Sequence, residues 1–370
     1  MNKRDLSYRG CACCDRDTLS LSGAALSRRN FMLGMAGAAA MTAVDLGKPE
    51  RALAQATEPA KPHRIDVHHH LSPPTYIVAS SSSNFGDPLM KNWTPEKSLG
   101  DMDKAGVATA MLSVTTPGIN FTSDEAARKL VRECNEYAGK LRTDHPGRFG
   151  SFAMIPLADV EGSLREIEYA LDTLKADGIG LMTSYGDKWL GDPLFLPVME
   201  ELNRRKAIVY THPTAANCCV NLVRTQPPVM IEFGTDTTRT IADVIFSGNA
   251  QKFRDIKWIF SHAGGTMPFL IERLVRHPLL DPKAKPTVPE GTLAELRRFY
   301  YDTAQTSNKA AMSALSAIIP VSQIVFGTDY PYRTSIDHVK GLKDAGVFSD
   351  AEIMEIERGN ALKLLPRLAA

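Results

Sequence analysis

Several features that would point to familiar classes of protein are missing from this chain. It contains no G-x-G-x-x-G stretch and no Walker sequence, so nothing supports a nucleotide cofactor. The net charge is only +1, which gives no support for nucleic acid or an anionic membrane as a partner. Six cysteines occur in 370 residues, and beyond position 14 they are Cys134 and the adjacent pair Cys218 and Cys219. Because neighbouring cysteines rarely bridge well, we expect no disulfide framework.

The first 56 residues have the character of an export signal and a linker. Arg28 and Arg29 precede a weakly apolar, Gly- and Ala-rich stretch at 33–43, a pattern that resembles a twin-arginine signal. That stretch is too short for stable membrane insertion. Small residues at Ala52, Ala54 and Ala56 offer processing sites. We expect the twin-arginine export machinery as a partner and a periplasmic or exported protein; the alternative is a disordered tail on a cytoplasmic protein.

Residues 57–370 alternate short apolar runs with longer segments of helical period, which is typical of repeated β/α units. The eight predicted strands are 64–68, 107–114, 149–155, 178–183, 207–211, 257–261, 299–303 and 323–328. The predicted helices are 95–104, 123–141 with Ser123 as its cap, 160–176, 193–205, 238–247, 267–276, 293–298, 309–317, 336–343, 350–358 and 360–365. Eight strands predict one closed (β/α)8 TIM barrel rather than an open doubly wound sheet. The segment 71–93 is too long for a simple loop, and we expect it to form a lid.

Side chains that bind metals or carry protons stand at the ends of four predicted strands. His68 and His70 end the first strand, and because they are two residues apart they should share one face. His212 ends the fifth strand, His262 the sixth and Asp329 the eighth. All strand ends of a β/α barrel open onto one face, which hosts the active site. We therefore expect these five side chains to converge.

Two neighbours of the paired histidines have different expected positions. Asp66 should share their face by the same two-residue period, either as a partner that orients an imidazole or as a buried, salt-bridged carboxylate below the site. His69 should face the helical shell and be replaceable. The other histidines end no predicted strand and are interpreted as surface or turn residues: His63, His145, His277 and His338.

Beyond these residues, whole stretches of the chain resemble the amidohydrolase superfamily. Ser-His-Ala-Gly-Gly at 261–265 followed by Pro268, Phe-Gly-Thr-Asp-Tyr-Pro at 326–331 and Gly-Asn-Ala at 359–361 are similar to its aminocarboxymuconate-semialdehyde decarboxylase branch. Stretches 65–71, 112–114, 117–118, 236–239 and 300–303 resemble the 6-methylsalicylate decarboxylase-like members of that branch. The likeness extends from about residue 64 to 368 and implies a (β/α)8 barrel of the metal-dependent hydrolase type.

The resemblance also implies a role for each candidate residue. It gives one divalent metal, with zinc expected and manganese as the alternative, and its ligands would be His68, His70, His212 and Asp329. His262 would be the acid/base residue beside the metal. Arg273 would bind the carboxylate of a substrate, in some members across the interface of a homodimer; otherwise it is an ordinary arginine on a helix surface. Gly100 stands where the muconate branch has a further arginine, which argues for a smaller or less charged acid.

Three functions fit these residues. The first is non-oxidative decarboxylation of a small aromatic or unsaturated carboxylic acid, hydroxybenzoate-like, with a proton supplied by Asp329 or His262. The alternative is hydrolysis of a lactone, ester or amide by a metal-bound water, with Asp329 as base and His262 steadying the oxyanion. A metal-dependent binding protein without activity would have no need of His262. The decarboxylase-like stretches favour the first function.

Overall fold

Eight parallel strands form the centre of the computed structural model, which describes residues 62–83, 86–122, 124–220 and 222–369. In sheet order they are β1 (Arg64–His70), β2 (Val107–Ser113), β3 (Phe149–Met154), β4 (Gly178–Met182), β7 (Ile208–His212), β8 (Lys257–Phe260), β9 (Tyr300–Asp302) and β10 (Ile324–Val325). All eight predicted strands are confirmed. The predicted export signal and its processing lie outside the described residues and stay predictions. The first three cysteines also lie outside them.

The ring of strands is closed by the chain that follows β10. The backbone N–H of Val67 donates to the carbonyl of Phe326 (2.9 Å), and the N–H of Asp329 donates to the carbonyl of His68 (2.8 Å). A further parallel bridge joins His69 to Tyr330. The first and last strands therefore meet, and the predicted (β/α)8 TIM barrel is confirmed.

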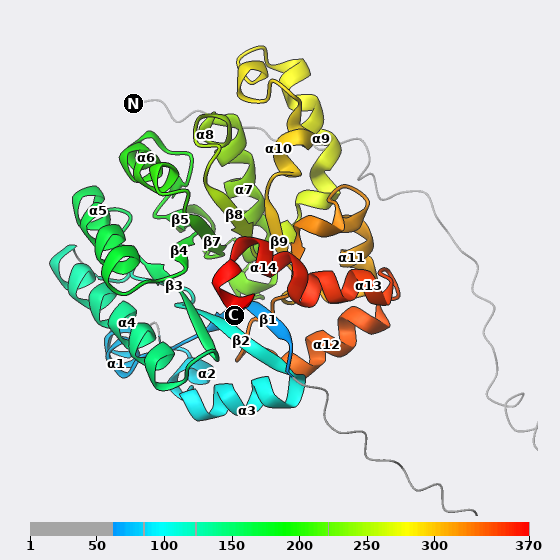
Figure 1. Cartoon of the computed structure of the whole chain (residues 1–370). Coiled ribbons are helices and arrows are strands. Elements are labelled where there is room, and N and C mark those ends of the chain that lie inside the picture. Colours follow the sequence, from blue (N-terminus) through cyan, green and yellow to red (C-terminus); the bar gives the residue numbers. More distant parts are fainter. Residues whose placement is uncertain (1–61, 84–85, 123, 221, 370) are drawn as a thin grey trace, which may run out of the picture. The chain divides into compact units, whose positions relative to one another are not determined.

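Helices surround this barrel (Figure 1). They are α1 (Pro74–Ser82), α2 (Pro88–Lys91), α3 (Pro95–Ala105), α4 (Asp124–Asp144), α5 (Val160–Glu168), α6 (Leu196–Arg204), α7 (Glu232–Phe246), α8 (Asn249–Lys252), α9 (Met267–Leu280), α10 (Thr292–Leu296), α11 (Lys309–Ser316), α12 (Ser335–Asp344), α13 (Asp350–Met354) and α14 (Asn360–Leu364). A two-stranded hairpin of β5 (Ser184–Tyr185) and β6 (Lys188–Trp189) follows β4. Within the described ranges, no helix has the length and apolar character needed to cross a bilayer.

The predicted helices are present, but several of them begin or end at other residues than predicted. Helix α7 begins at Glu232 rather than at Thr238, and threonine hydroxyls in its first turns donate to carbonyls four residues back. The predicted helix 160–176 is α5 continued by a π-helical turn at Tyr169–Thr173. The proposed cap at Ser123 lies outside the described residues.

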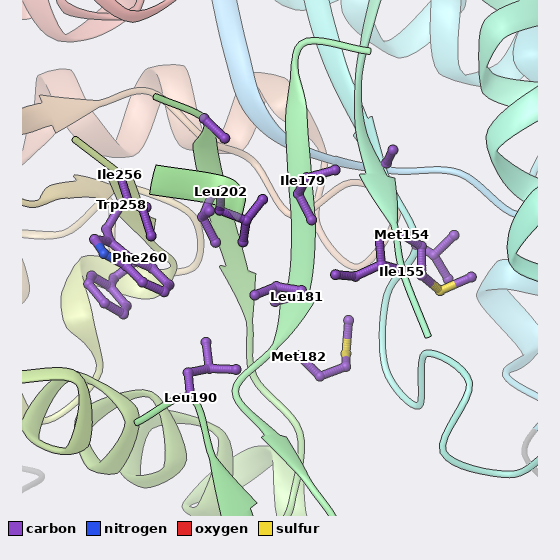
Figure 2. Packing of buried hydrophobic residues seen from close by; sticks show 14 of the residues in the cluster. Met154, Ile155, Ile179, Leu181, Met182, Leu190, Leu202, Ile256, Trp258 and Phe260 are labelled. Carbon is purple, nitrogen blue, oxygen red and sulfur yellow. The ribbon is translucent and has the colours of Figure 1, made fainter. Parts of the chain in front are cut away.

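Two apolar clusters hold the barrel together. One fills the inside of the ring and is closed at one end by α14, which supplies Ala361. The other lies between the strands and the outer helices, where Ile179 and Leu181 of β4 pack near Leu202 of α6 (Figure 2). The alternate residues Gly180 and Met182 therefore face the inside of the barrel. Among the described residues, Cys134, Cys218 and Cys219 are free thiols.

The insertion at 71–93 contains α1 and α2 and reaches the strand-end face of the barrel. From α1, the Tyr76 hydroxyl donates to the carbonyl of Gly118 in the loop after β2 (2.8 Å). Before α2, the Asp87 carboxylate accepts a hydrogen bond from the Tyr332 hydroxyl, just beyond Asp329 (3.1 Å). The insertion thus borders the predicted site; its role as a lid stays a prediction.

Candidate metal centre

Four predicted ligands meet at the strand-end face of the barrel. One donor atom from each of His68, His70, His212 and Asp329 lies within 4.8 Å of all the others, and all four side chains are buried. Asp329 Oδ1 lies 3.0 Å from His68 Nε2, 2.8 Å from His70 Nε2 and 3.8 Å from His212 Nε2. The convergence expected from the strand ends is therefore present.

The imidazoles are oriented to present the same nitrogen inward. His68 Nδ1 donates to Asp302 Oδ2 (2.8 Å), His70 Nδ1 to the carbonyl of Ser113 (3.3 Å), and His212 Nδ1 to the carbonyl of Pro213 (2.9 Å). Each Nδ1 thus holds the proton, and each Nε2 is left for a cation. Outer partners of this kind are typical of histidines that bind metals. The donor set therefore fits one divalent metal ion.

The pKa shifts favour metal binding at His70, His212 and Asp329, whereas His68 has to release a proton before its Nε2 can bind a cation. Burial lowers the pKa of His70 and lowers the pKa of His212 well below its usual range, which keeps both imidazoles neutral, the form that binds metal. Burial also acts to lower the pKa of His68, but the Asp302 and Asp329 carboxylates outweigh it and raise this pKa to about 10. Burial alone would raise the pKa of Asp329, yet the facing imidazoles, His68 first, bring it well below its ordinary value. Asp329 is therefore an anion ready to bind a cation.

Because of a bulge in β1, Asp66 does not share the face of His68 and His70, although the two-residue period predicted that it would. The pairing with β2 shifts between Asp66 and His69, so the two-residue alternation is broken there. Asp66 accordingly lies on the side of His69: its Oδ2 accepts from His69 Nδ1 (2.9 Å), and it also accepts from Thr328. Asp66 does orient an imidazole, but that of His69 rather than that of a metal ligand. Its contact with a metal ligand is a hydrogen bond that Asp66 Oδ1 accepts from the backbone N–H of His68 (3.0 Å).

His69 faces the helical shell, as predicted. Its Nε2 lies 2.6 Å from the Ser98 hydroxyl of α3, and its ring stacks on that of Tyr330 at 4.7 Å between centroids. The side chain is completely buried with both ring nitrogens bonded. We therefore expect a substitution of His69 to cost stability even if the metal site is kept.

Asp302 is a functional residue that strand-end reasoning missed. It ends β9, is fully buried, and binds His68 through Oδ2, while its Oδ1 accepts from the backbone N–H of His262 (2.8 Å). One carboxylate thus positions a metal ligand and the candidate acid/base residue together. The signal was available, because Asp302 is the last but one residue of the predicted strand 299–303.

His262 is held over the ligands by an unusual turn. His262 and Ala263 have φ of 53° and 55°, and the two glycines that follow also have positive φ. At Gly265 a Cβ would lie 2.0 Å from the carbonyl oxygen of Gly234, so only glycine fits. His262 Nε2 lies 3.6 Å from Asp329 Oδ2 and has no hydrogen-bond partner in the described part of the chain. A buried imidazole nitrogen left free in this way is available to a substrate.

The prediction that His338 is a surface or turn residue is wrong. It is completely buried on α12, where its Nε2 accepts from the backbone N–H of Gln305 (3.0 Å) and its Nδ1 donates to the carbonyl of Thr334 (3.1 Å). Gln305, with φ of 57°, in turn donates from its side chain to Asp329 Oδ2 (2.9 Å). Burial lowers the pKa of His338, so it is neutral and supports the ligand through Gln305. His63, His145 and His277 are partly exposed, in keeping with the prediction.

Arg273 lies apart from the cluster described above. It is an exposed residue of α9, the helix that follows the His262 turn, and makes no ion pair with any described residue. Phe269 on the same helix is 76% exposed. In the described part of the chain, no ion pair links Arg273 to the Asp329 carboxylate of the metal site.

Three imidazoles and a carboxylate at the strand-end face of an eight-stranded barrel define a (β/α)8 enzyme with a single metal site. The chain belongs to the amidohydrolase family, whose model matches residues 65–367. It is 39% identical to decarboxylase yanB of Aspergillus niger over 82% of this chain and 88% of that protein. It is 36% identical to the 6-methylsalicylic acid decarboxylase of Penicillium expansum over 82% and 97% of the two chains. A dihydroxybenzoic acid decarboxylase from Polaromonas sp., solved with manganese and 2-nitroresorcinol, matches with a TM-score of 0.72 at 20% identity, covering 82% and 97%.

Proposed function

We propose that this protein is a metal-dependent, non-oxidative decarboxylase of a small aromatic acid of the hydroxybenzoate type. One observation carries the proposal: a free, buried His262 Nε2 stands 3.6 Å from a carboxylate that belongs to a complete four-donor metal site. The similarity to curated decarboxylases over 82% of the chain supports it. No redox cofactor is required, because the reaction exchanges a carboxyl group for a proton.

The metal ligands and His262 have different roles in the proposed reaction. When bound, a divalent ion supplies positive charge that attracts the oxygens of the acid and stabilises negative charge as it develops. The ring–carboxyl bond breaks, carbon dioxide leaves, and the ring carbon takes one proton in its place. Because Asp329 is held as an anion, it is a poor proton donor. His262 therefore supplies the proton from Nε2, and Asp302 fixes the backbone from which it does so.

We propose zinc as the metal, with manganese as the alternative. Nitrogen donors from three imidazoles suit zinc well, and one carboxylate is compatible with either ion. The manganese in the Polaromonas structure supports the alternative only weakly, because at 20% identity that likeness speaks for the fold. Elemental analysis of protein purified without added metal distinguishes the two ions.

The proposal is tested by offering the metal-loaded protein salicylate-type acids alongside a panel of lactones, esters and amides. We expect carbon dioxide and the corresponding phenol in equal amounts from at least one acid. Cleavage of the ester or lactone panel with no carbon dioxide from any acid would instead make the protein a hydrolase.

We also propose that Arg273 binds the substrate carboxylate across a homodimer interface. Its exposure on α9, beside the exposed Phe269, leaves it free to reach a second copy. Arg273→Gln should then raise KM by about 10-fold or more, since a charge-assisted hydrogen bond is worth about 1.5–3 kcal/mol. Arg276→Gln, an exposed arginine of the same helix, is the matched control. A monomer by light scattering, or equal KM values for the two variants, would contradict this role.

A further inference from the structure

Gln305 is an exposed residue in the loop after β9, and its side chain reaches the metal centre. The side-chain amide donates from Nε2 to Asp329 Oδ2 (2.9 Å). The backbone of Gln305 has φ of 57°, in the left-handed region that residues other than glycine rarely adopt. Strain of this kind persists only where the surrounding structure holds it, and it is concentrated at functional sites. The position of this amide is thus maintained at a cost to the backbone.

A buried histidine of α12 holds the backbone of Gln305 in this conformation. His338 Nδ1 donates to the carbonyl of Thr334 (3.1 Å), so its Nε2 carries no hydrogen and accepts from the backbone N–H of Gln305 (3.0 Å). Helix α12 lies directly against the loop, because a Cβ at Gly341 would collide with the carbonyl oxygen of Ser307. The amide of Gln305 therefore reaches Asp329 from a fixed backbone.

The two oxygens of the Asp329 carboxylate have different neighbours. Oδ1 lies 3.0 Å from His68 Nε2 and 2.8 Å from His70 Nε2, among the donor atoms that fit a metal ion. Oδ2 accepts the hydrogen bond from Gln305 and lies 3.6 Å from His262 Nε2. A carboxylate can bind a divalent cation through one oxygen or through both. While Gln305 holds Oδ2, only Oδ1 is directed toward the nitrogens of the ligand histidines.

We propose that Gln305 is a positioning residue that keeps Asp329 a one-oxygen ligand, so that one coordination position of the metal stays open for the acid. Without the amide, Oδ2 is free to turn toward the cation and to fill that position itself. The use of the open position by an acid rests on the proposed function. The effect of Gln305 on metal coordination does not.

Two substitutions remove the hydrogen bond in different ways. Gln305→Asn keeps a residue that adopts the left-handed conformation readily, but the side chain is one methylene shorter and withdraws its donor from Oδ2. Gln305→Leu keeps a side chain of similar size without a donor. Gln323→Leu is the matched control, because Gln323 donates its side-chain amide to the carbonyl of Phe299 (3.2 Å) at the other end of the strands.

Manganese(II) makes the open position measurable without any acid. Bound Mn²⁺ speeds the magnetic relaxation of solvent protons mainly through water that exchanges at its free coordination positions. At one Mn²⁺ per chain, both Gln305 variants should enhance this relaxation less than the wild type does, because Oδ2 takes the place of water. Gln323→Leu should match the wild type. For an acid that the wild type decarboxylates, kcat/KM should fall about 10–100-fold in the two Gln305 variants, the usual cost of losing an outer partner of a metal ligand.

Equal relaxation in the wild type and in both Gln305 variants would overturn this role. Loss of manganese from the variants would also overturn it, because Gln305 would then hold Asp329 for metal binding itself. Lower relaxation with an unchanged kcat/KM would refute the use of the open position by the acid. If the wild type decarboxylates no acid, the proposed function fails, while the relaxation measurements still decide whether Gln305 controls the coordination of the metal. If one variant does not fold, the other supplies both measurements.

Discussion

Replacing His262 by asparagine is expected to lower kcat for carbon dioxide release by about 10²–10⁴-fold, the usual contribution of a positioned acid/base group. The reason is geometric: His262 Nε2 has no hydrogen-bond partner among the described residues and lies 3.6 Å from the Asp329 carboxylate. Asparagine keeps a polar group of similar reach but cannot exchange a proton near neutral pH. The measurement is kcat by carbon dioxide release, with metal content determined on the same sample.

The matched control is His277→Asn on α9, which removes a partly exposed imidazole packed against Phe246. This variant should keep kcat and metal content. If His262→Asn stays within about 10-fold of the wild-type kcat with its metal in place, His262 does not donate the proton. A loss of metal in His262→Asn would instead show that it is a further ligand.

Replacing His68 by alanine should remove the metal and with it all decarboxylation. The change deletes one of four donors and leaves Asp302 as a completely buried carboxylate without its imidazole. Loss of an outer partner alone weakens metal binding by roughly 10–100-fold, and loss of a ligand should exceed that. The unpaired carboxylate should also cost about 3–5 kcal/mol of folding free energy. Metal titration followed by calorimetry, together with Tm, measures both effects.

His69→Ala is the matched control for His68→Ala, because the bulge in β1 leaves His69 on the other side of the strand from the metal ligands. This histidine is equally buried and lies between the two ligands in sequence, but its nitrogens bond Asp66 and Ser98 on the outer side of the strand. It should lower Tm and keep the metal. Equal metal loss in His68→Ala and His69→Ala would mean that general destabilisation, rather than ligation, explains the result.

Much of this arrangement could be predicted from the sequence because barrel strands carry strong local signals. Short apolar runs located all eight strands, and their common end located His68, His70, His212, His262 and Asp329. The rule works because parallel strands in a closed barrel leave no choice about which ends meet. Asp302 obeys the same rule and could have been found by applying it to every predicted strand.

The remaining features depend on packing that no local pattern encodes. A bulge moves Asp66 to the outer side of β1, and strict alternation cannot anticipate an extra residue in one strand. His338 lies on an amphipathic helix, and its burial follows from contact with Gln305, far away in sequence.

The central claim is that one metal ion at the four-donor site makes this protein a decarboxylase. The most direct test strips the metal by chelation and then titrates zinc or manganese back while carbon dioxide release from a methylsalicylate or salicylate is recorded. We expect no activity without metal and a linear recovery that ends at one ion per chain. Full activity in the chelated protein, or recovery that continues to two ions per chain, would contradict it.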